Sequence, residues 1–467
     1  MGRRSVAVVG GGISGLAAAW ELSRAAGDLD VTVLESTDRV GGKLRLADVG
    51  GIAVDVGAES VLARRPEALA LVEELGLSGR LTHPAAVGAS VVAGGRRRPL
   101  PKGTLMGVPS DPDSLHGLLS DAEVERVRAE HPVPSGAADV SVGDLVDARL
   151  GRAVTDRLVE PLLAGVYAGH ARAISAEAAV PVLARAAREG RSLLEVAREV
   201  ASAAAASAGQ PVFATLEGGL GTLPAALADA LVDAGVRLRT GAVVRRLRAD
   251  GAGWVVTTGP TTAEVDERFD AVVLATPARP TARLLADAAP DAAAALAAIE
   301  YASMAIVTLC LDGAPPAVLE GSGFLVPPTE PLSIKASTFS TVKWPWLARA
   351  HPDRTFLRAS LGRHRDEATL QRSDDDLVAT ALADLRTVLG DGLPDPSAVH
   401  VQRWGGGLPQ YAVGHLARIR PARALPPGLT VCGAAYDGVG IPACIGSGRA
   451  AARAVLTRWP DAAAALG

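Results

Sequence analysis

The hydrophobic and polar positions of this chain alternate between short strand-like runs and helical patterns, and the N-terminal stretch shows the order most clearly. Residues 6–9 form an apolar run with strand character, and three spaced glycines and an Ala/Leu-rich helical pattern follow at once. A second apolar run over 31–34 ends in Glu35. Strand, glycine turn, helix and strand in this order predict a βαβ unit of the dinucleotide-binding kind.

The spacing of the glycines predicts a separate role for each. Gly10 permits the tight turn out of the strand, Gly12 lets the backbone approach a pyrophosphate, and Gly15 lets the helix pack close to the sheet. The free N–H groups and the dipole at the helix start favour phosphate charge. Glu35 follows the glycines by about 20 residues, the spacing of the acid that holds a ribose hydroxyl. The alternative is a structural turn without a ligand.

The remaining pattern divides the chain into regions. A strand-like run over 80–102 precedes a helical texture over 103–208, in which helices are expected at 152–164, 175–189 and 192–207, and residues 301–363 again read as strands. Further helices are expected at 65–76 and 373–389.

Residues 428–449 repeat the sequence of a strand, a glycine-rich loop and a helix start. A second helix N-terminus can therefore point at a ligand, and the ligand domain is built from separated segments. Such reach suits a cofactor longer than a nicotinamide dinucleotide.

Composition narrows the class of protein. The chain has 467 residues, enough for two or three subdomains, and its net charge of −4 argues against a nucleic-acid partner. Its three cysteines lack metal-ligand spacing, so no metal and no disulfide framework are expected. Neither a signal peptide nor a spanning apolar run is found, which predicts a cytoplasmic protein.

Seven motifs in order along the chain resemble those of the flavin amine oxidase superfamily, and within it the protoporphyrinogen/coproporphyrinogen oxidase family. They comprise Gly10–Gly15 with Glu35, Arg39–Lys43, Gly57–Ser60, Leu100–Gly103, Leu216–Leu220, Leu408–Ala412 with Gly414-His415, and Gly433–Gly448. The chain is most similar to the coproporphyrinogen-oxidising branch of Gram-positive bacteria.

The resemblance implies an α/β (α+β) fold with three parts. A Rossmann-like FAD-binding domain of the p-hydroxybenzoate hydroxylase/amine oxidase type would comprise 1–85, 209–295 and 400–467. A mixed-sheet substrate domain would comprise 86–102 and 296–399, and a helical subdomain would span 103–208. In relatives the helical part touches membrane, so peripheral contact with the inner face of the cell membrane is a further expectation.

The resemblance also implies noncovalent FAD and the residues that surround it. Pyrophosphate, ribose, ribityl chain and flavin ring would be held by Gly10, Gly11, Gly12, Ile13, Ser14, Gly15, Glu35, Ser36, Arg39, Gly42, Lys43, Gly57, Ala58, Glu59, Ser60, Val244, Trp404, Gly433, Val439, Gly440 and Ile441.

The implied reaction is the six-electron oxidation of coproporphyrinogen III to coproporphyrin III by molecular oxygen, with hydrogen peroxide as by-product, in haem biosynthesis. A haem-pathway enzyme is a candidate partner. The alternatives are a protoporphyrinogen IX oxidase, a flavin amine oxidase, which the aromatic content of 3% disfavours, a carotenoid-desaturase-like enzyme and a non-catalytic FAD-binding module.

No catalytic base is assigned, because the eight histidines are scattered along the sequence. Propionates of the substrate need cationic partners. The candidates are Arg64, Arg65, Arg96 to Arg98, Lys335 and Lys343, with Tyr167 as a cavity-lining candidate. Both lysines lie in strand-like segments, and the alternative for each is a snorkelling edge-strand lysine.

Overall fold

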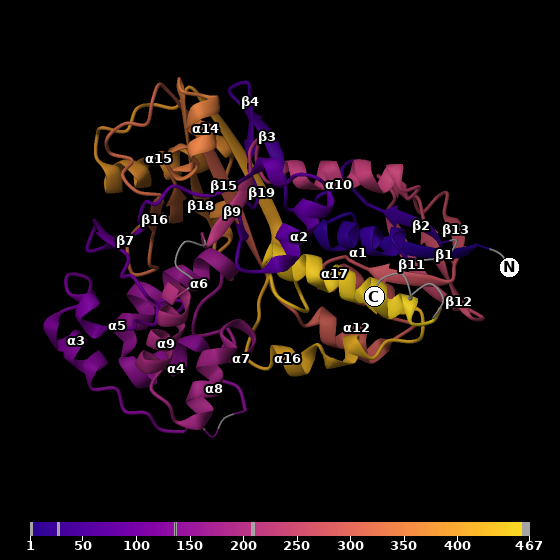
Figure 1. Cartoon of the computed structure of the whole chain (residues 1–467), viewed down its shortest axis with the longest axis horizontal. Helices are drawn as coiled ribbons and strands as arrows, with labels where there is room; N and C mark the ends of the chain where they lie inside the picture. The colour runs from indigo at the N-terminus through magenta and orange to yellow at the C-terminus, as the bar shows by residue number, and fades with distance from the viewer. Residues whose placement is uncertain (1–2, 26–28, 135, 137, 207–210, 460–467) are drawn as a thin grey trace.

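A parallel five-stranded sheet forms the centre of one half of the molecule (Figure 1). The computed structural model describes residues 3–25, 29–134, 136, 138–206 and 211–459. The strand order of the sheet is β10-β2-β1-β14-β20. The bounds are β1 (Arg4–Val9), β2 (Leu29–Leu34), β10 (Arg237–Arg239), β14 (Ala271–Leu274) and β20 (Leu429–Val431).

The two faces of this sheet carry different layers. Val6 and Val8 pack with the helices α1 (Ile13–Ser23), α10 (Thr222–Asp233) and α17 (Ile441–Leu456). Ala7 and Val9 point the other way because side chains alternate along a strand. On that face lie the antiparallel strands β11 (Val244–Asp250), β12 (Gly253–Thr258) and β13 (Val265–Phe269), with α11 (Ala278–Leu285) and α12 (Pro290–Ala297).

A mixed seven-stranded sheet forms the second part, in the order β19-β15-β18-β17-β16-β7-β8. Only β16 and β7 pair in parallel. The bounds are β7 (Ser90–Ala93), β8 (Arg96–Pro99), β15 (Tyr301–Asp312), β16 (Gly323–Leu325), β17 (Ile334–Thr338), β18 (Arg354–Leu361) and β19 (Ala398–Pro409). The predicted boundary at 400 falls inside β19, which pairs with β15.

Helices cover this second sheet on one side and near one end. Helix α15 (Asp374–Leu389) buries Leu377, Ala381 and Leu385 against the sheet. The short helix α14 (Pro345–Ala350), which follows α13 (Ser340–Lys343), packs with the hairpin of β3 (Leu46–Val49) and β4 (Ile52–Asp55). Residues 340–350 were expected to be strand, and that prediction is wrong. Trp344 and Trp346 enter a separate hydrophobic cluster there, so tertiary burial outweighs the local strand pattern.

The third part is helical and has its own hydrophobic core, at the lower left of Figure 1. Its elements are η2 (Pro112–Leu115), α3 (Asp121–Arg128), α4 (Val142–Leu150), α5 (Arg152–Val154), the π-helical turn η3 (Thr155–Val159), α6 (Glu160–Tyr167), α7 (Ala176–Ala179), α8 (Pro181–Glu189) and α9 (Leu193–Ala206). The predicted helix at 152–164 corresponds to the continuous run from α5 to α6. The predicted boundary between 208 and 209 lies outside the described residues.

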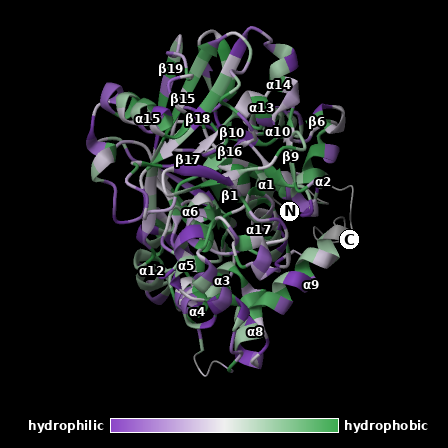
Figure 2. Cartoon of the chain, turned by 90° about the vertical axis from the view of Figure 1, so that its left-hand side faces the viewer, coloured by the Kyte–Doolittle hydropathy of each residue, from purple (hydrophilic) through white to green (hydrophobic). Residues whose placement is uncertain are grey.

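Short elements connect the three parts. They are β5 (Val61–Leu62), α2 (Pro66–Glu74), η1 (Ser78–Arg80), β6 (Leu81–Thr82), β9 (Phe213–Leu216), η4 (Ala368–Gln371), α16 (His415–Arg418) and η5 (Arg420–Arg423). Figure 2 shows that hydrophobic residues dominate β15 and β18, whereas the peripheral helices α8 and α9 alternate between hydrophobic and hydrophilic positions. Among the described residues, no helix has both the length and the apolar character needed to span a bilayer.

Candidate cofactor cavity

A cavity of about 700 Å³ opens at the carboxyl ends of the parallel strands. Its walls include Val9 at the end of β1, Leu34 at the end of β2, Ala275 after β14 and Gly433 after β20. Open parallel sheets bind their ligands at this edge, and the volume is in the range of small-molecule sites. The cavity also reaches Leu408 and Pro409 at the end of β19, so it extends from the parallel sheet to the seven-stranded sheet.

Gly10 and Gly15 have the turn and packing roles that the spacing of the glycines predicts, and Gly12 faces the cavity. Gly10 has a φ of +108°, and a Cβ there would lie 2.9 Å from the Ala275 carbonyl oxygen. A Cβ at Gly15 would lie only 1.9 Å from the Gly10 carbonyl oxygen, so Gly15 is required for packing α1 on β1. Gly12 lines the cavity, and a Cβ there would have no protein atom within 4 Å. Gly12 therefore leaves open space for a ligand rather than for the protein.

Glu35 lines the same cavity and is fixed by its neighbours. The Gly11 amide donates to Oε2 at 2.7 Å, and the Thr37 amide donates to Oε1 at 2.8 Å. The hydroxyls of Ser36 and Thr37 also donate to Oε1. The carboxylate is thus held at the end of β2 beside the glycine turn, as the βαβ motif requires.

The second helix start lies opposite the first. Val439, Ile441 and Cys444 at the start of α17 line the cavity, as do Ile13 and Ser14 of α1. Neither helix has a side-chain cap on its first N–H groups. Two uncapped helix N-termini around one cavity favour an anionic ligand such as a pyrophosphate.

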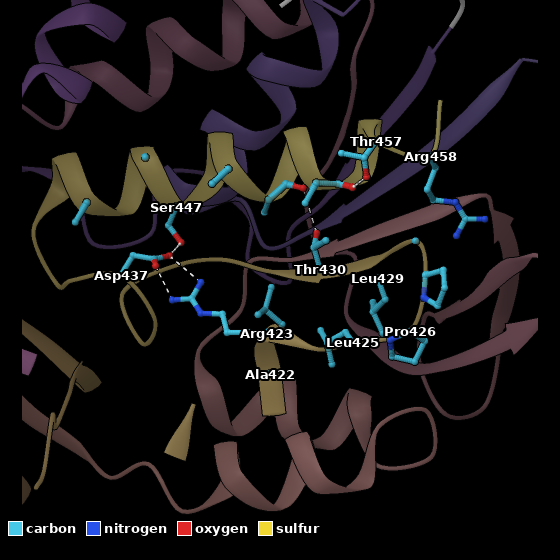
Figure 3. A pocket seen from close by; sticks show the side chains of 18 of the residues that line it. Ala422, Arg423, Leu425, Pro426, Leu429, Thr430, Asp437, Ser447, Thr457 and Arg458 are labelled. Atoms are coloured by element: carbon cyan, nitrogen blue, oxygen red, sulfur yellow. Dashed lines mark hydrogen bonds and ion pairs between the residues drawn. The ribbon is translucent and has the colours of Figure 1, made fainter. Parts of the chain in front are cut away.

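A polar network that includes Ser447 of α17 supports the loop over residues 433–440 (Figure 3). The Gly433 amide donates to the Ser447 hydroxyl at 3.0 Å, and that hydroxyl donates to Asp437. Arg423 donates to Asp437 at 2.5 Å and to the Tyr436 carbonyl at 3.1 Å. Arg423, Asp437 and Ser447 border a second cavity of about 680 Å³ beside α17. The network fixes the backbone that forms one wall of the first cavity.

A buried ion-pair cluster lies behind the predicted flavin-facing segment 57–60. Glu59 accepts from Lys343 at 2.6 Å and from Arg358 at 2.9 Å, and Arg358 also donates to the Gly57 carbonyl at 2.6 Å. Burial by itself would raise the pKa of Glu59, but the two cations outweigh it and bring the pKa to about 2. The side chain of Glu59 therefore anchors the segment, while Ala58 lines the cavity.

Three predicted cofactor residues around this segment have distinct positions. Lys43 lines the cavity. Loss of solvent around its ammonium group lowers the pKa of that group. Trp404 packs on Gly57 and donates from Nε1 to the Val56 carbonyl at 3.2 Å. Arg39 donates to the Gly42 carbonyl at 3.0 Å and is not among the lining residues.

Most of the predicted cofactor residues meet at the cavity. Those that line it are Gly10, Gly12, Ile13, Ser14, Glu35, Ser36, Gly42, Lys43, Ala58, Val244, Gly433, Val439 and Ile441. Of the others, Trp404 contacts Val56 and Gly57, which do not line the cavity. The rest adjoin lining residues in sequence or by a contact described above: Gly11, Gly15, Arg39, Gly57, Glu59, Ser60 and Gly440.

The predicted substrate residues are dispersed instead. Arg64 and Arg65 are exposed, and Arg65 borders the second cavity. Arg97 on the edge strand β8 donates to the Val318 and Glu320 carbonyls. Tyr167 is buried with its ring centroid 5.5 Å from that of Tyr411.

Neither lysine is a snorkelling edge-strand residue. Lys335 is buried on β17, which lies between β18 and β16. Lys343 ends the helix α13. The edge-strand alternative is therefore wrong for both residues. The position of Lys335 depends on strand pairing between distant segments, which makes β17 central, and the segment of Lys343 is helical.

Sequence reasoning missed several polar residues that the fold brings together. His170 and His364 are neighbours, since His170 Nε2 lies 3.2 Å from the His364 carbonyl oxygen, so the histidines are less scattered than the sequence suggests. Arg358 and Arg363 were not selected among the many arginines. Arg358 stands in the apolar run 355–361, where a charged residue is the available signal.

Within the part of the chain that the structure describes, no group of three or more His, Cys, Asp or Glu side chains is arranged to hold a metal ion. Cys310, Cys432 and Cys444 are all buried free thiols.

The parallel sheet, the glycine turn, the fixed acid and the second uncapped helix start define a dinucleotide-binding protein. The residues fit such a group, because Gly12 faces open space and both helix starts leave their N–H groups free. The chain belongs to the family described as flavin containing amine oxidoreductase, whose model matches residues 13–456. This membership makes a flavin the cofactor class and an oxidase the enzyme class.

Relatives match over nearly the whole chain. The sequence is 42% identical to the coproporphyrinogen III oxidase of Mycobacterium tuberculosis, over 97% of each chain. It is 32% identical to the coproporphyrinogen III oxidase of Bacillus subtilis, over 98% of each chain. A solved structure from Exiguobacterium sp. 255-15 superposes with a TM-score of 0.85 at 32% identity, covering 98% of this chain and 100% of the other.

Proposed function

We propose that this protein is an FAD-dependent oxidase that converts coproporphyrinogen III to coproporphyrin III in haem biosynthesis, with molecular oxygen as the final acceptor. The observation that carries the proposal is the cavity at the switch from the parallel sheet to the seven-stranded sheet, in a chain whose whole length matches enzymes of that name. A dinucleotide site that continues into a second, apolar wall suits a cofactor whose reactive ring meets a large substrate.

The proposed FAD site uses both uncapped helix starts. Gly12, Ile13 and Ser14 would hold the pyrophosphate at α1, and Glu35 would hold the adenosine ribose. Val439 and Ile441 would lie along the flavin ring. When bound, FAD accepts two electrons in each of three successive substrate oxidations and returns them to oxygen, so that three molecules of hydrogen peroxide form per porphyrin.

Noncovalent binding is supported by the chemistry of the lining thiol. Among the described lining residues, Cys444 is the one cysteine and there is no histidine, so its thiol is the side chain to consider for a bond to the flavin. Burial raises the pKa of the Cys444 thiol, and the thiol contacts the Gly438 and Val439 carbonyls at 3.7 and 3.9 Å. A protonated, buried thiol is a poor nucleophile, so no bond to the flavin is expected.

The chain contributes position and dryness rather than an acid–base pair. Leu408, Pro409, Val439 and Ile441 form apolar walls that exclude water from the reacting atoms. The hydroxyl of Tyr301, also at the cavity, accepts from the Ala278 amide at 2.7 Å. No proton acceptor is assigned among the lining residues that the structure describes.

The test uses the purified yellow protein. Denaturation should release FAD rather than FMN, as identified by chromatography. Addition of coproporphyrinogen III in air should give coproporphyrin fluorescence with three peroxides per porphyrin. A higher kcat/KM for protoporphyrinogen IX would replace the proposed substrate, and peroxide release with a polyamine but without porphyrin would establish the amine oxidase alternative. Flavin colour without substrate-dependent reduction would indicate a non-catalytic module.

Peripheral membrane contact and association with a haem-pathway enzyme remain predictions. Co-sedimentation of the holoenzyme with vesicles containing anionic lipid tests the first, and a change of the sedimentation coefficient on mixing with that enzyme tests the second.

A further inference from the structure

Two cations are buried side by side at the boundary between the seven-stranded sheet and the helical part. Lys335 on β17 is 5% exposed, and Arg363, just after β18, is 8% exposed. Lys335 Nζ donates to the Gly362 carbonyl at 2.8 Å, and Arg363 Nη2 donates to the Val326 carbonyl at 2.8 Å. Arg363 Nη1 is buried without a hydrogen-bond partner, and among the described residues neither cation forms an ion pair with a carboxylate.

Two carboxylates influence Arg363 electrostatically: Asp366, which is exposed, and Glu160, which is committed to other groups. Glu160 Oε2 accepts from the Ala171 amide at 2.6 Å, and Glu160 Oε1 lies 2.9 Å from His170 Nδ1. Glu300 pairs with Arg365 and lies 3.2 Å from His364. The two buried cations are thus left with carbonyl oxygens as their direct partners within the described chain.

The contrast with Lys343 shows that this arrangement is not the rule in this fold. Lys343, the other largely buried lysine of the same domain, has the Glu59 carboxylate 2.6 Å from its Nζ. A charge buried without a counter-ion lowers the stability of a protein. Lys335 and Arg363 are therefore better explained by an anion that binds them than by the fold itself.

The position of the two cations relates them to the cofactor cavity. Helix α6 packs against β16 and β17, and its last residue, Tyr167, accepts from Gln410 Nε2 at 2.7 Å through its carbonyl. The residues just before Gln410 are Leu408 and Pro409, which line the cavity. Glu160 at the start of α6 acts electrostatically on Arg363, so the cations lie near this helix.

The face of α6 toward β16 is open at Gly165. Gly165 of α6 is exposed, and a Cβ there would have only Leu325 Cδ2 of β16 within 4 Å, at 4.0 Å. We propose that Lys335 and Arg363 form the anion site that binds one carboxylate of the substrate, with Lys335 Nζ and Arg363 Nη1 as donors. This inference rests on the proposed function, because coproporphyrinogen III carries four propionates.

The site distinguishes acidic from esterified or less acidic tetrapyrroles. A carboxylate between an ammonium and a guanidinium makes charge-assisted hydrogen bonds that an ester or a vinyl group cannot make. The two cations are therefore specificity-determining groups for a propionate.

The experiment measures KM, kcat and product affinity of the holoenzyme. The variants are Lys335→Met and Arg363→Gln, and the matched control is Arg365→Gln, since Arg365 is two residues from Arg363 but 73% exposed. We expect KM for coproporphyrinogen III to rise about tenfold in each variant, the loss of one charge-assisted contact, with kcat within about threefold and flavin content unchanged. The control should keep the wild-type KM.

Binding of coproporphyrin III, followed by flavin or protein fluorescence, provides a readout independent of turnover. The variants should bind coproporphyrin III about tenfold more weakly and should bind its tetramethyl ester like the wild type. Wild-type KM in both variants, or equal weakening for acid and ester, would overturn the proposal. Absence of porphyrinogen turnover by the wild type would overturn the proposed function as well, so the two failures are distinguishable. Should Arg363→Gln not fold, Lys335→Met decides alone, because methionine fills the buried stem of the lysine.

Discussion

Gly12 and Gly15 belong to one turn, and substitutions at these positions should fail in opposite ways. At Gly12 the backbone angles are φ −71° and ψ 172°, which any L-residue adopts, and a Cβ has no protein atom within 4 Å. Gly12 is the N-cap of α1, where aspartate is among the preferred residues. Gly12→Asp should therefore change the stability of the apoprotein by only a few tenths of a kcal/mol.

The same substitution should abolish flavin binding. The new carboxylate would stand where the first N–H groups of α1 meet the cavity, beside the bound pyrophosphate. Two like charges about 4 Å apart at an effective dielectric constant of about 20 repel by about 4 kcal/mol, which corresponds to about a thousandfold weaker binding. Gly12→Asn is the matched control: it has nearly the same shape and also caps the helix, so it retains the steric effect and removes the charge.

Gly15→Ala should instead damage the fold with or without flavin. Its Cβ would lie 1.9 Å from the Gly10 carbonyl oxygen and 3.0 Å from Ala275 Cβ, so the turn must shift by more than an ångström. Overpacking of this kind costs about 1–3 kcal/mol or more. The assay is urea unfolding of the apoproteins by circular dichroism, together with FAD titration by calorimetry. A Gly12→Asp variant with wild-type FAD affinity, or a Gly15→Ala apoprotein of wild-type stability, would refute the division of roles.

Three further perturbations test the packing and charges of the fold. Lys335 has a pKa of about 7, lowered from the ordinary 10.5 first by burial and then by Arg363; the unfolded chain therefore binds more protons between these values, and stability should rise with pH. Relative to Lys335→Met, the wild type should gain roughly 3 kcal/mol between pH 7 and 9.5 in urea unfolding, and no relative change would contradict the buried charge. Glu59→Gln leaves two buried cations without their carboxylate and should cost about 3–5 kcal/mol, measured the same way; a neutral effect would place the cluster in solvent. Gly448→Ala would put a Cβ 2.1 Å from the backbone of α1 and should separate the two cofactor helices and lower the melting temperature, whereas Gly446→Ala, with ordinary contacts, should not.

Local patterns were sufficient for the elements that form the cofactor cavity. The runs at 6–34 and 428–449 predicted β1, α1, β2, β20 and α17, because strand, glycine turn and helix start are encoded within a few residues. The ion pair of Glu59 with Arg358 joins residues 299 positions apart, and no local pattern selects one arginine among many. The burial of Lys335 was equally hidden, since it follows from the order of the strands around β17.

The residues at the helix starts differ between the cofactor cavity and the rest of the fold. At the peripheral helices α3, α4, α7 and α15, a serine side chain accepts from the first-turn amides. Before α10 the Asp55 carboxylate accepts from the Leu220 and Gly221 amides at 2.8 Å each, and these amides precede the first turn. The helices α1 and α17 have Gly12 and Gly440 at the same position, and neither supplies a cap. Glycine there forgoes a few tenths of a kcal/mol relative to serine and leaves the amides to a ligand. Gly221 of α10 and Gly414 of α16 are also N-cap glycines without a side-chain cap. An uncapped glycine therefore indicates a ligand-binding helix only where the helix start also lines the cavity, as those of α1 and α17 do.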